Sequence, residues 1–321
     1  MPYILTAPCG DAIENLARDE LLLNELVPGE IALYLFVNDR AVIIGRNQNP
    51  YIECDMNKLN ADGVQLVRRI TGGGAVYHDR GNLNYSFIAS EGNYNEARQF
   101  SVILSALSHF GIQAELSGRN DITCSGLKFS GTAFSQRGHN RMQHGTLLVN
   151  TDLSALAGYL TPSRLKLEAK GVKSVRSRVG NLNKLNPALT VETMRSALIC
   201  AFEAEYGKWT PYPQDSGFLE RLDRMKALRS SCQWRIGESP RYDAELENRL
   251  SFGMLKLCLN ISGGKIAGCK VYSDCLNEDL PERFANSLVG RSFNGESMAE
   301  ALVNILPEGR ETAEWLRKTD L

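Results

Sequence analysis

Three consecutive glycines, at positions 72, 73 and 74, follow the pair Arg68-Arg69 and precede the pair His78-Asp79. Glycine clusters usually mark turns, and a plain turn would need no ligand. A plain turn also needs no paired arginines at its entrance. Backbone without Cβ atoms lets a flat or anionic ligand reach N–H groups directly, and a carboxylate or phosphate near Arg69 would gain a charge-assisted hydrogen bond. The stretch therefore indicates an anion-binding site, with a simple turn as the alternative.

The glycine stretch matches neither of the two common phosphate-binding motifs. No GxxxxGKS/T sequence is present, and the glycines precede a strand-like pattern rather than the helix that a GxGxxG motif opens. We therefore expect any bound nucleotide to be held by a different arrangement.

A second candidate centre is Lys128, in the strand-like run LKFSGTA at 127–133. A lysine on a strand is most often a solvated edge residue. Here the small residues that follow, Ser130 and Gly131 among them, leave room for a ligand beside the ammonium group. Asp121 lies close in sequence and could supply a counter-charge. Lys128 is therefore our candidate for chemistry on an anionic substrate.

Two further segments carry polar or basic side chains. His144 lies in the run QHGTLL, where a lone histidine is by default a packing residue. Residues 166–183 are rich in Lys and Arg and have little apolar periodicity, so we expect a long functional loop, although a charge run alone is usually a solvated face.

The elements that must position these residues are short strands and helices in mixed order. Apolar spacing predicts helices over 11–26, 95–110 and 190–206. Alternation predicts strands over 31–37, 41–45, 83–88, 112–116, 122–124, 128–135 and 143–149. Strands in runs with helices packed around them predict an α+β fold, with a large domain built on a mixed, mainly antiparallel β-sheet.

The last quarter of the chain predicts a separate small α+β unit. Leucines alternate over 255–261, Gly263-Gly264 makes a tight turn, and a second strand begins near Ile266. Helical patterns follow at 279–289 and 296–305. We expect a catalytic domain at 1–235 and an accessory domain at 240–321.

Composition excludes several classes of function. The chain has 321 residues and a net charge of −1, so it has no broad basic field for a nucleic acid. No window approaches eighteen apolar residues, which argues against a membrane span, and the N-terminus lacks the features of a signal peptide. The eight cysteines form no CxxC pair and the histidines no HExxH pattern, so we expect reduced thiols, no zinc site and a cytoplasmic protein.

Taken in order, these motifs resemble the lipoate–protein ligase A family, in its bacterial two-domain type within the biotin/lipoate ligase superfamily. The resemblance covers nearly the whole chain, including the entrance to the second domain at Trp234, Gly237 and Pro240. It rests on IGRNQNP at 44–50, RRITGGGAVYHDRGN at 68–82, GRND at 118–121, LKFSGTA at 127–133, QHGTLLVN at 143–150 and KGVKSVRSRVGNL at 170–182.

The resemblance implies a two-step reaction that begins with ATP and lipoate. Lipoate is first activated by ATP, with Mg²⁺, to lipoyl-AMP. The lipoyl group then passes to a lysine of an acceptor lipoyl domain, in 2-oxoacid dehydrogenase complexes or in the glycine-cleavage H protein.

The resemblance also implies roles for individual residues. Lys128 is the catalytic residue that bridges the lipoate carboxylate and the α-phosphate, and Asp121 either orients Lys128 or helps to hold Mg²⁺. The implied ATP-binding residues are Arg69, Gly74, Ala75, Val76, Tyr77 and Lys128. The implied lipoate-binding residues are Arg69, Thr71, Gly72, Gly73, His78, Lys128 and His144. The implied lid over the adenylate consists of Lys170, Gly171, Val172, Lys173, Ser174, Val175, Arg176, Ser177, Arg178 and Val179.

Two other functions stay open at this point. An ATP-independent octanoyl or lipoyl transferase of the same fold could use a cysteine nucleophile, for which Cys124 is the thiol nearest in sequence to the candidate site, although a passive buried cysteine is the more common case. A non-catalytic lipoate or nucleotide binder is the other alternative. Dependence of the reaction on ATP distinguishes a ligase from the transferase. Release of pyrophosphate distinguishes a ligase from the non-catalytic binder.

Overall fold

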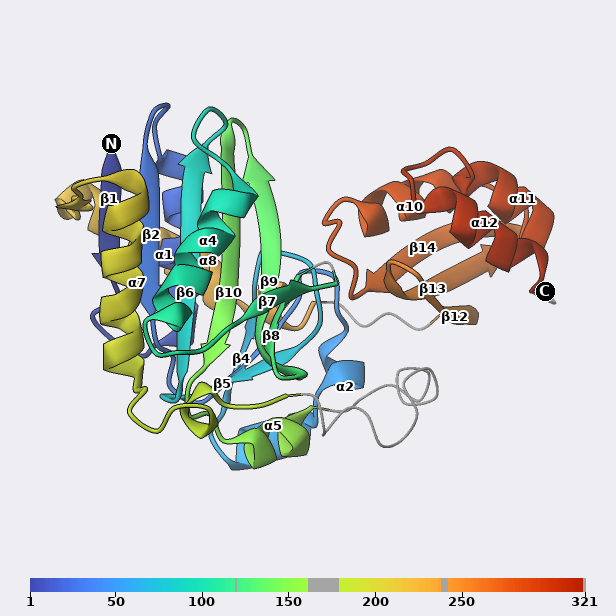
Figure 1. The fold of residues 1–321 in the computed structure, drawn as a ribbon. Helices are drawn as coiled ribbons and strands as arrows, with labels where there is room; N and C mark the ends of the chain where they lie inside the picture. Colours follow the sequence, from blue (N-terminus) through green and yellow to red (C-terminus); the bar gives the residue numbers. More distant parts are fainter. Residues whose placement is uncertain (119, 161–178, 238–241, 320–321) are drawn as a thin grey trace.

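The computed structural model describes residues 1–118, 120–160, 179–237 and 242–319. An eight-stranded sheet with the order β11-β1-β2-β6-β10-β9-β8-β7 forms the centre of the larger unit (Figure 1). Its strands are β1 (Pro2–Thr6), β2 (Ile31–Phe36), β6 (Asn82–Ser90), β7 (Glu115–Ser117), β8 (Asp121–Cys124), β9 (Leu127–Arg137), β10 (Asn140–Leu148) and β11 (Thr210–Pro211). Strands β11, β1 and β2 run parallel, and every pair from β2 to β7 is antiparallel. The predicted mixed, mainly antiparallel sheet is confirmed.

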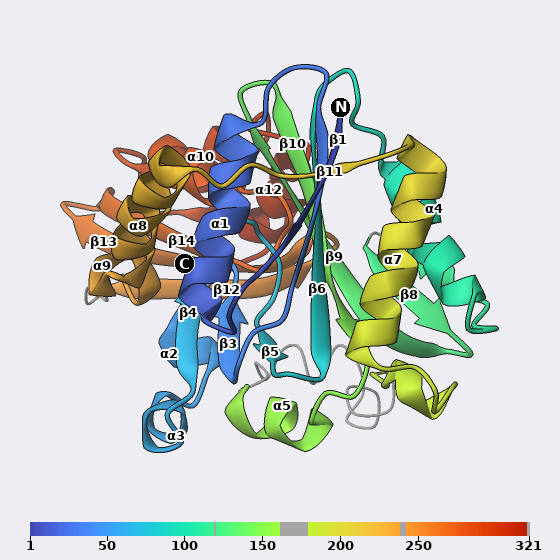
Figure 2. The same cartoon turned by 90° about the vertical axis from the view of Figure 1, so that its left-hand side faces the viewer.

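Helices cover both faces of this sheet, as Figure 2 shows. Helices α4 (Glu96–Ser108) and α7 (Val191–Tyr206) pack on one face, over a core that includes Phe87 and Phe202. Helices α1 (Ala12–Glu25) and α8 (Ser216–Ser230) pack on the other, over Leu22 and Tyr34. The side chain of Asp11 caps α1 by accepting from two amides of its first turn. The helices predicted over 11–26, 95–110 and 190–206 correspond to α1, α4 and α7.

A second, three-stranded sheet carries the glycine stretch. Its order is β4-β3-β5, with β4 (Gln65–Arg68) parallel and β5 (Val76–His78) antiparallel to the central β3 (Ala41–Ile44). The glycines connect β4 to β5. The connection between the predicted strands 31–37 and 41–45 therefore joins two sheets, because β2 pairs in the large sheet and β3 in the small one. The short helices α2 (Pro50–Glu53), α3 (Met56–Ala61) and α5 (Leu153–Tyr159) lie at the same end of the molecule (Figure 2), and η1 (Leu182–Lys184) precedes α7.

Residues 242–319 form the C-terminal unit, beside the N-terminal unit of residues 1–237 (Figure 1). An antiparallel sheet of β12 (Ala244–Leu250), β13 (Gly253–Ser262) and β14 (Lys265–Ser273) packs against α10 (Leu280–Leu288), α11 (Gly295–Leu302) and α12 (Gly309–Arg317) around its own core. The predicted turn is present, since Gly263 and Gly264 both have positive φ. Helix α9 (Cys232–Arg235) ends the N-terminal unit.

Some elements differ from the sequence-based expectation. The strand predicted at 112–116 is β7, shifted to Glu115–Ser117, because Ile112 packs into the core directly after the turn at Gly111. Helices α5, α8 and α12 were not predicted. Within the described ranges, no helix is long and apolar enough to cross a membrane.

Candidate active site

A cavity of about 970 Å³ lies where the large sheet, the small sheet and the C-terminal unit meet. Lys128 and His144 reach it from the large sheet, and His78 reaches it from the small sheet. Gly74 lines it from the glycine stretch, and Arg249 lines it from β12 of the C-terminal unit. All four segments singled out in the sequence therefore reach one cavity, the fourth of them through Val179, although they lie up to 110 positions apart in the chain.

Both the side chain and the backbone of Lys128 are held in place at the wall of this cavity. Its ammonium lies 2.6 Å from Oδ1 of Asp121 on the neighbouring strand β8. Its carbonyl oxygen accepts a hydrogen bond from the amide of Gly180, at 2.9 Å. A Cβ atom on Gly131 would lie 3.3 Å from Nζ, so a glycine there leaves the ammonium open to the cavity. Of the two roles considered for Asp121, the geometry supports the orientation of Lys128.

Arg69 is buried and its guanidinium is surrounded by carbonyl oxygens. Nη2 donates to the carbonyl oxygens of Gly72 and Gly74, at 2.6 and 2.9 Å, and Nη1 donates to that of Ile43 at 3.3 Å. Nε donates to the hydroxyl of Thr71 at 3.0 Å. Burial lowers the pKa of Arg69 to about 10, so it stays charged at neutral pH. The hydrogen bonds of Arg69 therefore hold the backbone of the glycine stretch in place around the guanidinium. The sequence did not predict this role.

Arg68 faces away from the cavity and organises a different loop. Its Nη1 donates to the carbonyl oxygens of Gly45, Arg46 and Gln48, and its Nε donates to that of Trp234, at 2.8 Å. The indole of Trp234 returns a hydrogen bond to the carbonyl of Arg68, at 2.9 Å. Both arginines therefore donate their hydrogen bonds mainly to backbone carbonyl oxygens.

The three glycines have separate functions. A Cβ atom on Gly72 would overlap the carbonyl oxygen of Cys275, in the connection between β14 and α10. Gly73 has a φ of +92° and donates its amide to the same carbonyl oxygen. Gly74 has no atom within 4 Å of its Cβ position and lines the cavity. Of the three, only Gly74 leaves free space for a ligand in the cavity. The missing side chain at Gly72 instead allows the backbone of the C-terminal unit to approach.

A buried chain of hydrogen bonds holds His144 in the cavity wall. Its Nδ1 lies 2.8 Å from Oδ2 of Asp19 on α1, and its Nε2 lies 2.9 Å from the hydroxyl of Thr71. Thr71 in turn accepts from Nε of Arg69. The Asp19 carboxylate can only accept, so in the neutral ring of His144 the proton lies on Nδ1 and Nε2 accepts from the hydroxyl of Thr71. Thr71 itself lies behind the wall and is fully buried.

Two family models match this chain. The lipoyl protein ligase A/B catalytic domain matches residues 11–203, and the bacterial lipoate protein ligase C-terminus matches residues 239–310. The chain belongs to the lipoyl protein ligase A/B family. It is 40% identical to lipoate-protein ligase A of Psychrobacter cryohalolentis over 291 residues, which cover 87% of this chain and 85% of that one. It is 36% identical to lipoate-protein ligase A of Bdellovibrio bacteriovorus over 321 residues, covering 95% and 94%.

Solved structures of lipoate protein ligases share this fold. LipL1 of P. falciparum in complex with lipoate superposes with a TM-score of 0.88 at 29% identity, over 99% of this chain and all of that one. A bipartite lipoate protein ligase of Thermoplasma acidophilum, described with its E2 lipoyl domain, gives 0.66 at 27% identity over 76% and 98%. A lipoate-protein ligase A bound with ATP gives 0.63 at 27% identity over 74% and 98%.

In this family member, the C-terminal unit is joined to the site by a second set of contacts. The carboxylate of Glu278 lies 3.3 Å from Arg46 and 3.6 Å from Arg137, both in the N-terminal unit. Burial raises the pKa of Glu278, and the two arginines oppose that shift. Asn47 donates its side-chain amide to the carbonyl of Glu278 and accepts at its own carbonyl from the amide of Ser273. These contacts bring Arg249 and Asp274 to the cavity.

The remaining predicted site residues fall into three groups. Ala75 and Val76 line the cavity, whereas Tyr77 packs against Tyr159 with ring centroids 5.5 Å apart. Val179 lines the cavity and pairs with Lys128, while the rest of the predicted lid, 170–178, lies outside the described residues. Cys124 is buried, does not line the cavity and has only a 3.7 Å contact with Ser125 Oγ, which gives no support to a cysteine nucleophile.

Proposed function

We propose that this chain is an ATP-dependent lipoate–protein ligase. It forms lipoyl-AMP and pyrophosphate from lipoate and ATP, and then transfers the lipoyl group to a lysine of an acceptor lipoyl domain. The observation that carries the proposal is the position of Lys128, an oriented ammonium group at the wall of a large cavity that also has an apolar side. The related structures named for bound lipoate and bound ATP support both substrates.

In the first step, a carboxylate oxygen of lipoate attacks the α-phosphorus of ATP, and the bond from that phosphorus to the pyrophosphate oxygen breaks. Both reactants are anionic, so a fixed cation between them offsets their repulsion and stabilises charge that develops on the phosphorus. Lys128 supplies this cation, and Asp121 keeps its ammonium in place before the substrates arrive. Removing one such contact typically costs roughly 3–4 kcal/mol of barrier, or two to three orders of magnitude in rate.

We assign the nucleotide to the side of the cavity formed by Gly74, Ala75 and Val76, where backbone N–H groups are not screened by large side chains. Arg69 contributes by shaping this backbone, and Tyr77 contributes by packing behind it. We assign the acyl chain to the side formed by His78 and His144. Residues 170–179 are proposed to cover the adenylate and to exclude water from the mixed anhydride.

We propose that Mg²⁺ binds together with ATP. No group of three or more His, Cys, Asp or Glu side chains is placed to hold a metal among the residues that the structure describes. Mg²⁺ is usually held by one or two carboxylates together with phosphate oxygens and water. Asp121 is the carboxylate that we considered for this role, but its ion pair with Lys128 favours the orienting role, so phosphate oxygens and water would supply most of the ligands. When bound, the ion would neutralise charge on the departing pyrophosphate.

In the second step, the uncharged amine of the acceptor lysine attacks the acyl carbon of lipoyl-AMP. The new C–N bond forms, the bond to the phosphate oxygen breaks, and AMP leaves as an anion while the amine loses its proton. The E2 lipoyl domain named with the Thermoplasma ligase supports lipoyl domains as acceptors. We propose those of the 2-oxoacid dehydrogenase complexes and the H protein.

The deciding experiment measures pyrophosphate release from ATP with added lipoate, for the native protein and for Lys128→Ala. We expect lipoate-dependent release that falls by at least a hundredfold in the variant. Glu115→Gln, an exposed change on β7, serves as the control. Acyl transfer without ATP would favour the octanoyl transferase instead, and adenylate binding without pyrophosphate release would favour the binder.

A further inference from the structure

The polyphosphate of ATP is strongly anionic, so the first step depends on positive charge in the cavity wall. Among the described residues, the lysine and arginine side chains that line the cavity are Arg69, Lys128 and Arg249. The carboxylates of Glu53 and Asp274 line it as well. Which of these cations can bind phosphate oxygens depends on the partners that each one already has.

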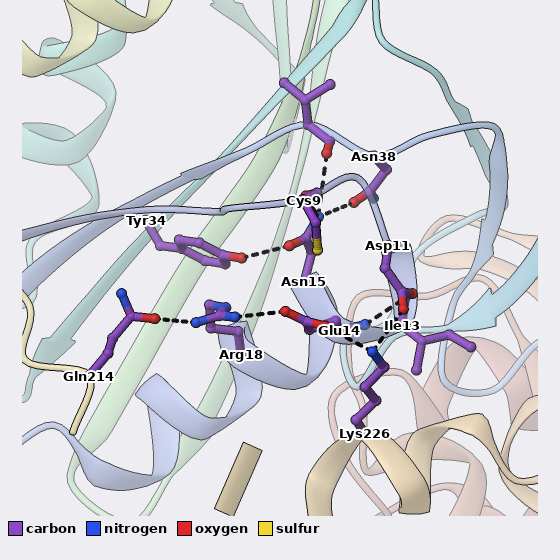
Figure 3. Close-up of polar contacts among 11 residues, drawn as sticks. Cys9, Asp11, Ile13, Glu14, Asn15, Arg18, Tyr34, Asn38, Gln214 and Lys226 are labelled. Carbon is purple, nitrogen blue, oxygen red and sulfur yellow. Dashed lines mark hydrogen bonds and ion pairs between the residues drawn. The ribbon is translucent and has the colours of Figure 1, made fainter. Parts of the chain in front are cut away.

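His78 also lines the cavity, but it adds no positive charge. Nδ2 of Asn15 lies 3.1 Å from the carbonyl oxygen of Cys9 and 3.3 Å from that of Val37. The same nitrogen donates to Oδ1 of Asn38 at 2.9 Å (Figure 3). Asn38 therefore presents its amino group to Nδ1 of His78, 2.9 Å away, and this ring nitrogen accepts. Burial lowers the pKa of His78 to about 3, so the ring is neutral at physiological pH.

The other charged groups of the large sheet and the glycine stretch already have partners. The Lys128 ammonium lies 2.6 Å from Oδ1 of Asp121, so this pair is neutral overall before substrates bind. The guanidinium of Arg69 donates to backbone carbonyl oxygens and to a hydroxyl group. His144 lies 2.8 Å from the carboxylate of Asp19 and adds no net positive charge. The described part of the N-terminal unit therefore offers little uncommitted positive charge to a polyphosphate.

Arg249, on β12 of the C-terminal unit, differs from these groups. Its guanidinium makes no hydrogen bond and no ion pair with any residue that the structure describes. Nη1 is buried, whereas Nε and Nη2 keep accessible surface, and the half-buried residue lines the cavity. A cation that is partly removed from water without a counter-charge is costly. The absence of a partner within the described ranges therefore indicates that an anion binds beside Arg249.

Arg249 lies on the side of the cavity to which we assign the nucleotide. It pairs with Met254 across β12 and β13, and the amide of Met254 donates to Oδ1 of Asp274 at 2.6 Å. The carbonyl oxygen of the next residue, Cys275, accepts a hydrogen bond from the amide of Gly73, 2.9 Å away. These contacts connect the backbone at Arg249 to the glycine stretch, whose end we assign to the nucleotide.

We propose that Arg249 binds the phosphate oxygens of ATP that leave as pyrophosphate. This inference rests on the proposed function and adds to its first step a catalytic residue from the C-terminal unit. A planar guanidinium can donate parallel hydrogen bonds to one phosphate group. When the bond from the α-phosphorus to the bridging oxygen breaks, its electron pair stays on that oxygen, and Arg249 stabilises the charge without losing a proton. Lys128 thus acts on the attacking carboxylate and Arg249 on the leaving group.

The role of Arg249 ends when pyrophosphate leaves, so its loss should affect the two steps differently. The second step starts from lipoyl-AMP, which has no β- or γ-phosphate. Removing the cation should therefore slow pyrophosphate release and leave transfer from lipoyl-AMP unchanged. A merely structural role of Arg249 would slow both steps, because both take place in the same cavity.

The test measures each step separately for the native protein, Arg249→Gln and Arg249→Lys. One assay follows lipoate-dependent pyrophosphate release, and the other supplies synthetic lipoyl-AMP and a lipoyl domain. We expect kcat for release to fall about a hundredfold in Arg249→Gln, and less in Arg249→Lys, which keeps the charge but not the planar fork. Transfer should keep its native rate in both. Equal losses in the two steps, or native release in Arg249→Gln, would overturn the proposal.

Arg310→Gln is the matched control, because Arg310 is an exposed arginine on α12 of the same unit and does not line the cavity. It should match the native protein in both assays. A loss of release in this variant as large as that in Arg249→Gln would show that any lost positive charge on the C-terminal unit has the same effect, and would contradict a specific role for Arg249.

Binding of inorganic pyrophosphate tests the same contact without turnover. Calorimetry should show roughly tenfold weaker pyrophosphate binding to Arg249→Gln than to the native protein, with equal binding of AMP. Equal pyrophosphate affinities would contradict the proposal. If the native protein releases no pyrophosphate with lipoate, the ligase function fails, and pyrophosphate binding still decides whether Arg249 holds phosphate groups. Equal release by the native protein and Arg249→Gln leaves the ligase function intact and removes only the role of Arg249.

Discussion

The backbone amide of Gly73 donates a hydrogen bond to the carbonyl oxygen of Cys275, 2.9 Å away, and thereby joins the two units main chain to main chain. A hydrogen bond between backbones tolerates many side chains, but it requires that both chains approach closely. The neighbouring Gly72 meets this requirement, because any Cβ atom there would overlap the same carbonyl oxygen.

Gly72→Ala should therefore weaken the docking of the C-terminal unit while both sheets remain folded. We expect a larger radius of gyration in small-angle scattering and faster proteolysis between residues 237 and 242. Gly92→Ala is the matched control, since a Cβ atom at Gly92 meets nothing within 4 Å and Gly92 has no positive φ. An unchanged scattering profile for Gly72→Ala would show that the contact is dispensable.

Asp121→Asn should slow the reaction without abolishing it. The carboxylate holds the Lys128 ammonium at 2.6 Å, but both side chains are about one third exposed, so water screens much of this interaction. We expect kcat for pyrophosphate release to fall about fivefold, with little change in the KM for ATP. A loss as large as that of Lys128→Ala, accompanied by a higher Mg²⁺ requirement, would instead indicate that Asp121 is a metal ligand.

His78 should make the protein less stable in acid. Its pKa is about 3 in the folded chain, against an ordinary value of 6.5. Between these values the unfolded chain binds a proton that the folded chain does not, so the free energy of unfolding falls as pH falls from about 6.5 toward 3, by up to about 1.4 kcal/mol per pH unit. Urea unfolding at several pH values should show a shallower dependence for His78→Gln than for native protein. Equal slopes would contradict this assignment.

Asp19→Asn should disturb the chain that ends at Arg69. The asparagine has nearly the shape of Asp19, and its carbonyl oxygen can still accept from Nδ1 of His144, but the charge of the carboxylate is lost. Its amino group then lies at the position of Oδ1, a buried atom without a hydrogen-bond partner among the described residues. We expect a loss of about 1–3 kcal/mol in the free energy of unfolding, measured by urea titration. Glu96→Gln, in the exposed first turn of α4, should change it by less than about 0.5 kcal/mol.

The sequence predicts the general architecture well, and Lys128 lies on a strand and lines the cavity. The period-2 and period-3.6 patterns identify β6, β9, β10, α1, α4 and α7, because each of these has a regular apolar face against the core. Lys128 could be recognised because small residues follow it. The short elements α5 and β5 have too few residues to show any period, so they were missed or left unassigned.

Contacts between distant parts of the chain could not be predicted in the same way. Arg69 looked like an anion ligand, yet its donors point at carbonyl oxygens of its own loop. The glycines looked like a ligand surface, but Gly72 is required by Cys275, about 200 positions later. Backbone carbonyls have no residue type, so a sequence gives no sign of which side chain they bind. The roles assigned to the individual site residues stay predictions.

The hydrogen bonds that orient Asn15 begin at the backbone oxygens of Cys9 and Val37, neither of which touches the cavity. The orientation of the His78 ring is therefore set through Asn15 and Asn38 by main chain in the first forty residues, and all three side chains are buried. Exchanging only the residues that line the cavity would leave this support unchanged. A different ring orientation at His78 requires the two asparagines to be replaced as well.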